Sequence, residues 1–141
     1  MPSRSTCATE IESLHDFFVD WYAGTMDEDN VERLERALAS GFEMVTPDGD
    51  RRDRAAVLEG IRGDYARDEP GTFAIEIRNV ELVAARDDHA TVRYEEWQTR
   101  GDETTGRIST VLFREDAAAP GGVVWLDLHE TWLDGENERD S

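Results

Sequence analysis

Lysine is absent from this sequence of 141 residues, and cysteine occurs once. All 15 basic residues are arginine, against 33 aspartate and glutamate residues, which gives a formal net charge of -18. Such a charge argues against binding to nucleic acid or to an anionic membrane surface, so neither is expected as a partner. The lone Cys7 excludes an internal disulfide and a cysteine-based zinc site, and we expect no metal, nucleotide or other cofactor.

Long apolar runs are also missing from the chain. No segment approaches the roughly 20 apolar residues of a membrane-spanning helix, and the first residues lack the apolar core of a secretion signal. We therefore expect a cytoplasmic protein. A chain of 141 residues is near the commonest domain size, and we predict a single domain over residues 1–133 with an acidic tail over residues 134–141.

The acidic residues are spread along the chain rather than gathered in one block. In molar salt the Debye length falls to about 3 Å, so repulsion between acidic groups is largely screened. Aspartate and glutamate keep a surface soluble better than lysine does, and arginine remains useful because its planar guanidinium binds a carboxylate in two places. The composition resembles that of cytosolic proteins of salt-accumulating halophiles, and we favour this interpretation over an acidic surface for binding a partner.

Three amphipathic helical patterns occupy the first half of the chain. They cover residues 9–23, 31–38 and 53–65. Gly24 and Gly41 are placed to end the first two helices, and Asp53 can cap the third. Between the second and third helices, a β-prone stretch over residues 42–46 is followed by a turn.

The second half of the chain alternates apolar and polar residues, which is typical of half-buried strands. Four strands are predicted, over residues 73–84, 90–99, 106–115 and 123–133. The apolar parity switches at Arg78-Asn79, where a β-bulge would keep one face of a bent strand directed inward. Helices followed by a meander of strands indicate an α+β fold with an antiparallel sheet. Large apolar residues occur on both strand faces, so we expect a homodimer formed through the sheet.

The order of these elements resembles a known family. The helix end at Ala23-Gly24, the strand and turn from Phe42 to Gly49, and the helix start from Arg54 to Ile61 are similar to the SnoaL-like branch of the nuclear-transport-factor-like superfamily. The closing strand from Trp125 to Thr131 extends this resemblance to nearly the whole chain. It implies a cone-shaped α+β fold, in which three amino-terminal helices pack in the concave face of a strongly curved antiparallel sheet, with an apolar pocket at the open end.

The resemblance leaves the function open, because superfamily members bind, dehydrate or isomerise steroid-like or polyketide compounds, or catalyse nothing. Ketosteroid isomerase needs a phenol, a carboxylate base and a neutral acid, and this chain places Phe17, Thr46 and Ser109 at those positions. We therefore predict a non-catalytic pocket for a small apolar ligand. The alternatives are a lyase, isomerase or hydrolase acting on an apolar cyclic or polyketide-like substrate, and a homodimerising association module without ligand.

The candidate catalytic residues are His129, Asp127 and Glu96. Asp127 lies two positions before His129 on one strand face and could orient its imidazole for acid–base chemistry, although a structural histidine is the more ordinary interpretation. Glu96 shares a strand face with Tyr94, so either could point into the cone. The candidate ligand-pocket residues are Phe17, Trp21, Tyr94 and His15.

Overall fold

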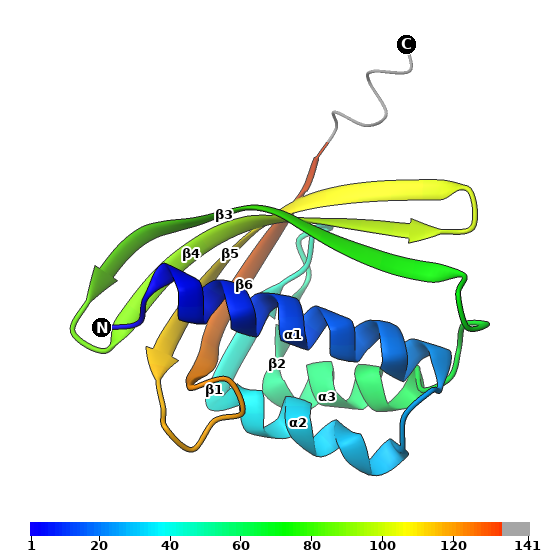
Figure 1. Ribbon diagram of the computed structural model, residues 1–141, viewed down its shortest axis with the longest axis horizontal. Coiled ribbons are helices and arrows are strands. Elements are labelled where there is room, and N and C mark those ends of the chain that lie inside the picture. Colours follow the sequence, from blue (N-terminus) through cyan, green and yellow to red (C-terminus); the bar gives the residue numbers. More distant parts are fainter. Residues whose placement is uncertain (134–141) are drawn as a thin grey trace.

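The computed structural model describes residues 1–133, and these form a helical layer packed on a curved sheet (Figure 1). The elements in chain order are α1 (Arg4–Ala23), the short 3-10 helix η1 (Glu28–Asn30), α2 (Val31–Ala37), β1 (Leu38–Val45), β2 (Arg51–Asp53), α3 (Arg54–Gly63), β3 (Phe73–Arg86), β4 (His89–Arg100), β5 (Glu103–Glu115) and β6 (Val123–Leu133). The predicted α+β fold is confirmed. The acidic segment 134–141, predicted as a tail, lies outside the described residues.

The sheet has the strand order β2-β1-β6-β5-β4-β3. Strands β3 to β6 form the antiparallel meander predicted from the sequence. The predicted meander is extended by β1, which pairs with β6 in parallel and with β2 in antiparallel orientation. After β2 the chain leaves the sheet to form α3 and then returns as the meander of β3 to β6. Strands β1 and β6 thereby become neighbours in the sheet.

Helix α1 lies along the concave side of the sheet, and α2 and α3 lie on the same side, near β1 and β2 (Figure 1). α1 begins earlier than expected, because the Ser3 side chain accepts a hydrogen bond from the Thr6 amide and caps the helix. Gly24 ends it in the left-handed conformation, with φ 69°. The expected stop at Gly41 is wrong, since α2 ends at Ala37 and Gly41 lies within β1.

Strand β3 contains the predicted β-bulge. Four residues of β3, from Arg78 to Glu81, lie opposite three residues of β4, from Arg93 to Glu95, and Asn79 has a positive φ of 56°. A second register shift follows, so Ala85 packs against the core instead of the expected Ala84. The bulges let one long strand bend while its apolar residues stay on the inner face.

Strand β6 contains a register shift that the sequence analysis does not anticipate. Trp125 pairs with Phe113 and Asp127 pairs with Leu112, which leaves Leu126 without a partner on β5. Residues two positions apart across this bulge therefore face opposite sides of the sheet. Trp125 is buried on the inner face, whereas Asp127 is exposed on the outer face.

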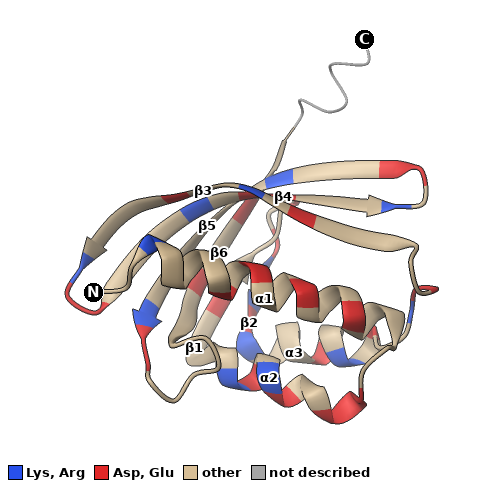
Figure 2. Cartoon of the chain, viewed as in Figure 1, with Lys and Arg blue, Asp and Glu red and all other residues tan. Residues whose placement is uncertain are grey.

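Charged side chains occur on both layers of the molecule. Figure 2 shows acidic residues along α1 and α2 and on several strands, with arginines interspersed. Within residues 1–133, no helix is long and apolar enough to cross a membrane.

Candidate functional site

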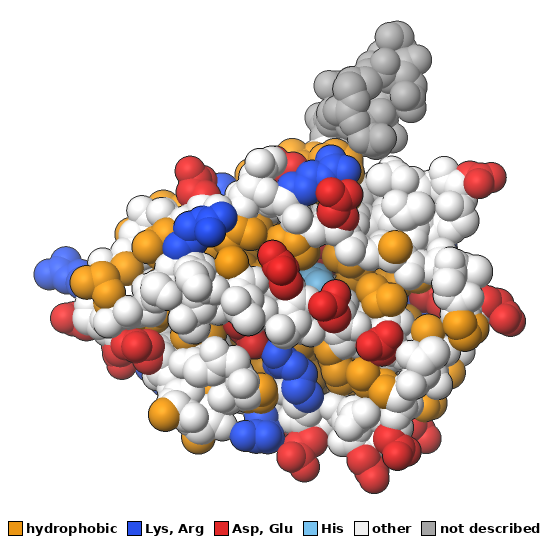
Figure 3. Space-filling model, in the orientation of Figure 1, with side chains coloured by type: hydrophobic (Ala, Val, Ile, Leu, Met, Phe, Trp, Pro, Cys, Tyr) orange, Lys and Arg blue, Asp and Glu red, His pale blue; other side chains and the backbone are white. Residues whose placement is uncertain are grey.

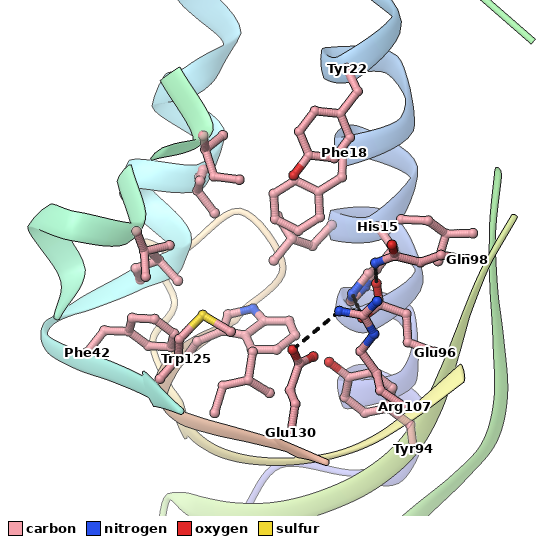
Figure 4. Close-up of a pocket in the computed structure, with 18 residues that line it drawn as sticks. His15, Phe18, Tyr22, Phe42, Tyr94, Glu96, Gln98, Arg107, Trp125 and Glu130 are labelled. Carbon is pink, nitrogen blue, oxygen red and sulfur yellow. Dashed lines mark hydrogen bonds and ion pairs between the residues drawn. The ribbon is translucent and has the colours of Figure 1, made fainter. Parts of the chain in front are cut away.

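A cavity lies between the concave face of the sheet and the helices (Figure 4). Its volume is about 160 Å³, close to the size of about 150 Å³ that accommodates benzene in a protein interior. The apolar part of its wall includes Phe18, Tyr22, Leu38, Phe42, Met44 and Trp125. The cavity can therefore hold a small, largely apolar molecule.

Polar side chains gather at one side of this cavity, on three neighbouring strands (Figure 4). Tyr94 of β4, Ser109 of β5 and Glu130 of β6 occupy one cross-strand row. Glu96 and Arg107 are paired in the next row. Residues two positions apart on a strand share a face, so both rows are directed to the inner side of the sheet.

His15 on α1 forms a buried pair with Glu96 on β4. Nε2 of His15 lies 3.0 Å from Oε1 of Glu96, and Nδ1 lies 2.6 Å from the carbonyl oxygen of Ile11. Nε2 of Gln98 donates a hydrogen bond of 2.7 Å to Oε2 of Glu96. Because the Ile11 carbonyl oxygen only accepts, Nδ1 must carry a hydrogen.

The His15–Glu96 pair is held in its ionised form. Burial disfavours the charged form of each residue, but the negative charge of Glu96 raises the pKa of His15. In the same way, burial opposes ionisation of Glu96, yet the neighbouring imidazolium lowers its pKa to about 2. The pair therefore places two opposite charges beside the cavity at neutral pH.

Glu130 is also buried, but its charge is less completely compensated. The hydroxyl of Ser109 donates a hydrogen bond of 2.9 Å to Oε2 of Glu130. Nη1 of Arg107 lies 3.8 Å from Oε1, longer than the roughly 2.8 Å of a charge-assisted hydrogen bond. Burial and the negative charge of Glu96 raise the pKa of Glu130 to about 7. This carboxyl group is poised between its protonated and ionised forms near neutral pH.

The hydroxyl of Tyr94 and Nε of Arg107 are buried without a hydrogen-bond partner among the described residues. Ser109 lies beside the Tyr94 hydroxyl and donates to Glu130, but no hydrogen bond joins the two hydroxyl groups. Burial raises the pKa of Tyr94 well above its usual range, so the phenol keeps its proton. Buried polar groups are nearly always paired in proteins, and two unpaired donors beside one cavity point to a ligand.

The structure brings together three of the residues singled out from the sequence. Glu96, Tyr94 and His15 all line the cavity. Asp127 and His129 are exposed on the opposite, outer face of the sheet, where they line a shallow groove with Arg93, Thr110 and neighbouring residues. The bulge at Leu126 separates these two residues from the inner face.

Phe17 and Trp21 pack in the core instead of lining the cavity. Their rings stack with centroids 5.7 Å apart, and Nε1 of Trp21 donates a hydrogen bond of 2.7 Å to the carbonyl oxygen of Ile61. This contact joins α1 to α3 and fixes the helices that form one wall of the cavity.

Sequence reasoning missed Arg107, Gln98 and Glu130. The strand alternation that links Tyr94 to Glu96 continues to Gln98, so this residue could have been found. Arg107 could have been found as the cross-strand partner of Glu96 if the predicted strands over residues 90–99 and 106–115 are paired as a hairpin. Glu130 gives no such signal, because only the bulge turns it toward the cavity. Among residues 1–133, no group of three or more His, Cys, Asp or Glu side chains is arranged to hold a metal ion.

Comparison with known proteins identifies the family of the chain. The model of the sucrose-6-phosphate phosphohydrolase C-terminal family matches residues 8–134. Sucrose-phosphatase 1 of Nicotiana tabacum is 23% identical over 137 residues, and sucrose-phosphatase 2 is 25% identical over 138 residues. Each alignment covers 95% of this chain and 32% of the tobacco protein, so the chain spans about a third of the length of these relatives.

Solved structures share the fold. An NTF2-like protein of unknown function from Pseudomonas aeruginosa has a TM-score of 0.82 and 34% identity, covering 91% of this chain and 98% of that one. The association domain of C. elegans CaMKII has a TM-score of 0.62 and 13% identity, covering 91% and 97%, and this likeness concerns the fold alone. The chain therefore belongs to the sucrose-6-phosphate phosphohydrolase C-terminal family and has an NTF2-like fold.

Proposed function

We propose that the cone binds a small, largely apolar molecule that carries one hydrogen-bonding oxygen, in the manner expected of a SnoaL-like pocket. The observation that carries this proposal is the Tyr94 hydroxyl, which belongs to a cavity-lining residue and has no partner among the described residues. An unpaired buried donor costs about 1–3 kcal/mol, which a ligand oxygen would recover. The apolar wall favours a less polar ligand than the sugar phosphate in the family's name.

Binding of small probe molecules tests the proposal. We expect cyclohexanone to bind more tightly than methylcyclohexane in a calorimetric titration, because only the ketone can accept a hydrogen bond from Tyr94. Tyr94→Phe should lower the cyclohexanone affinity about tenfold. Tyr65→Phe is the matched control, since the Tyr65 hydroxyl donates to the carbonyl oxygen of Met26 and Tyr65 does not line the cavity. Equal affinities for the two probes, or binding of neither, would contradict the proposal.

A second candidate function is proton transfer, as in a lyase or an isomerase. It is supported by two buried carboxyl groups whose pKa values shift in opposite directions, with Glu96 lowered and Glu130 raised to about 7. Glu130 would accept a proton from the carbon next to a carbonyl group. The C–H electrons would form a C=C bond, and the π electrons of the carbonyl group would move onto its oxygen. Tyr94 would donate a hydrogen bond to that oxygen.

Deuterium exchange into cyclohexanone, followed by NMR in D2O, tests this second function. We expect the protein to accelerate exchange next to the carbonyl group, and Glu130→Gln to slow it at least about tenfold. Equal exchange rates with the wild-type protein and this variant would exclude Glu130 as the base.

We also propose that the outer face of the sheet pairs with a second copy of the chain. Ile108 and Leu112 are only half-buried there, so this face leaves apolar side chains that a second copy could cover. Light scattering on the eluting protein should give a dimer mass for the wild-type protein and a monomer mass for Ile108→Glu. Ala55→Glu on the exposed side of α3 is the control that should stay dimeric. A monomeric wild-type protein would refute the pairing.

A further inference from the structure

Arg107 is an incompletely satisfied cation beside the cavity. A guanidinium group has five N–H donors, and the described residues provide Arg107 with no hydrogen bond. Its closest carboxylate oxygen belongs to Glu130, 3.8 Å from Nη1, although the Arg107 side chain is only 13% exposed. Nε of this half-buried guanidinium is buried without a partner, and the terminal nitrogens beside the cavity have donor capacity that the described residues leave unused, which a ligand could satisfy.

The position of this guanidinium is nevertheless fixed. It lies over the ring of Trp132, with 4.8 Å between Cζ and the ring centroid. Nε1 of Trp132 in turn donates a hydrogen bond of 2.8 Å to Oδ1 of Asp48. Arg107 is thus oriented before any ligand enters, and its orientation does not depend on a strong ion pair with Glu130.

The charges around the cavity depend on the proton of Glu130. The titratable or charged groups that face Glu130 are His15 from α1, Tyr94 and Glu96 from β4, and Arg107 from β5. When Glu130 is ionised, the two cations and the two carboxylates balance. When Glu130 is protonated, one positive charge next to the unused guanidinium donors remains uncompensated. A single negative charge on a ligand would restore the balance.

We propose that the cavity takes a small apolar monocarboxylate, held by the donors of Arg107 and Tyr94, and that its entry is coupled to the uptake of one proton by Glu130. This inference rests on the proposed function, because it names the polar end of the molecule that the cone binds. A planar carboxylate matches the guanidinium fork, which can donate two parallel hydrogen bonds to it. A phosphate dianion would leave an excess negative charge inside an apolar wall, and a neutral carbonyl would leave the cation unpaired.

The coupling sets the pH dependence of binding. Burial and Glu96 raise the pKa of Glu130 to about 7, so below this pH the group already carries its proton. Above it, each ligand must bring a proton into the site, and the affinity should fall by up to about tenfold per pH unit. A neutral ligand should show no such fall.

Calorimetric titration with benzoate and with its neutral analogue benzamide tests the inference, at constant ionic strength between pH 6 and 9. At pH 6.5 we expect benzoate to bind at least about tenfold more tightly than benzamide. At pH 8, titrations in buffers of different ionisation enthalpy should show uptake of close to one proton for benzoate and none for benzamide.

Three variants test the roles of Glu130 in proton uptake and of Arg107 in carboxylate binding. Glu130→Gln, which mimics the protonated carboxyl group, should keep benzoate binding while losing both the proton uptake and the pH dependence. Arg107→Leu should reduce benzoate affinity at least about tenfold, and should reduce it more than it reduces benzamide affinity. Arg107→Lys preserves the charge without the planar fork, so it should bind benzoate with intermediate affinity, and it serves as the test if Arg107→Leu does not fold.

The inference fails if benzoate binds no more tightly than benzamide, if its binding takes up no proton at pH 8, or if inorganic phosphate binds more tightly than benzoate. Benzamide binding without a preference for benzoate would leave the proposed pocket function standing and overturn the carboxylate specificity. If cyclohexanone, benzamide and benzoate all fail to bind, the proposed function fails together with the inference.

Discussion

Glu10 and Glu130 are both buried glutamates, but their charges are compensated to different degrees. Glu10 is 1% exposed and accepts hydrogen bonds from both terminal nitrogens of Arg33, at 2.7 and 3.2 Å, and from Nε1 of Trp125, at 2.9 Å. Glu130 has one hydroxyl donor and a distant guanidinium. We interpret Glu10 as a structural residue and Glu130 as a functional one, because only Glu130 lines the cavity and lacks a close cation.

Removing the cation from Glu10 should destabilise the protein. Arg33→Ala leaves a buried carboxylate with only Trp125 as a donor, and we expect the free energy of unfolding to fall by about 3–5 kcal/mol. Arg51→Ala is the control, because its pair with Glu43 is exposed and 3.5 Å long and should be worth less than about 1 kcal/mol. Urea denaturation measures both, and similar losses in the two variants would contradict the structural role of the Glu10 pair.

Titration of Glu130 should also change how the free energy of unfolding depends on pH. Its pKa is about 7 in the folded protein against about 4.5 ordinarily, so the folded state binds the proton more tightly. Stability contributed by this group is therefore lost as pH rises from about 4.5 to about 7.

Glu130→Gln should remove this loss. Relative to the wild-type protein, the variant should gain on the order of 1–3 kcal/mol when urea denaturation at pH 8 is compared with denaturation at pH 4.5. His15 and Glu96 titrate in both proteins, so their contributions largely cancel in this comparison. Parallel pH profiles for the two proteins would show that the carboxyl group is not perturbed in this direction.

At the scale of single elements, the two bulged strands explain which parts of the fold could be predicted. On β3, apolar residues mark the inner face on both sides of Arg78-Asn79, so the change of parity is visible in the sequence. On β6, the sequence allows either set of alternating residues to face inward. Asp127 and His129 form a plausible functional pair on one face, and Leu128 and Glu130 occupy the other. The bulge at Leu126 determines which set faces inward, and the sequence around it does not indicate a bulge.

Deleting Leu126 should therefore disrupt the fold more than its size suggests. Without the extra residue, either Trp125 must turn outward or Asp127 and His129 must turn inward. We expect a loss of more than about 3 kcal/mol of unfolding free energy by urea denaturation. Leu126→Ala keeps the backbone register and should cost about 1 kcal/mol. A deletion no more costly than the alanine variant would mean that the bulge does not set the register.

The strands near the start of the sheet were harder to predict for a different reason. β2 consists of Arg51, Arg52 and Asp53, which are polar and too few to show an alternating pattern. The parallel pairing of β1 with β6 joins segments about 80 residues apart, and such long-range pairing has no turn between the strands to reveal it. By contrast, the end of α1 at Gly24 and the cap of α3 at Asp53 depend on local chemistry, and both predictions are confirmed.

On the scale of the whole molecule, acidic side chains occur over much of the visible surface, interspersed with arginines and apolar side chains (Figure 3). The sequence carries a formal net charge of -18. Mutual repulsion of these groups opposes the compact state at low ionic strength and is screened at molar salt. We propose that this surface is adapted to concentrated salt.

Thermal unfolding in potassium chloride tests the adaptation. Between 0.1 and 2 M salt, we expect the stability to rise by about 2 kcal/mol, which corresponds to a Tm increase of roughly 5–10 °C. A protein that is fully stable at 0.1 M and gains nothing at 2 M would not be adapted to salt.

The hydrogen bond from Trp125 to Glu10 spans 115 residues, and it constrains the order in which the chain can assemble. During synthesis, α1 leaves the ribosome before every strand of the sheet, and β6, which lies between β1 and β5, leaves it after the other strands. Until β6 emerges, Glu10 lacks its indole donor and β1 lacks its long neighbour. Contacts of such high sequence separation slow folding. The buried pair of Glu10 and Arg33 therefore acquires its third hydrogen bond only after β6 has been made, later than the contacts that join α1 to β3 can form.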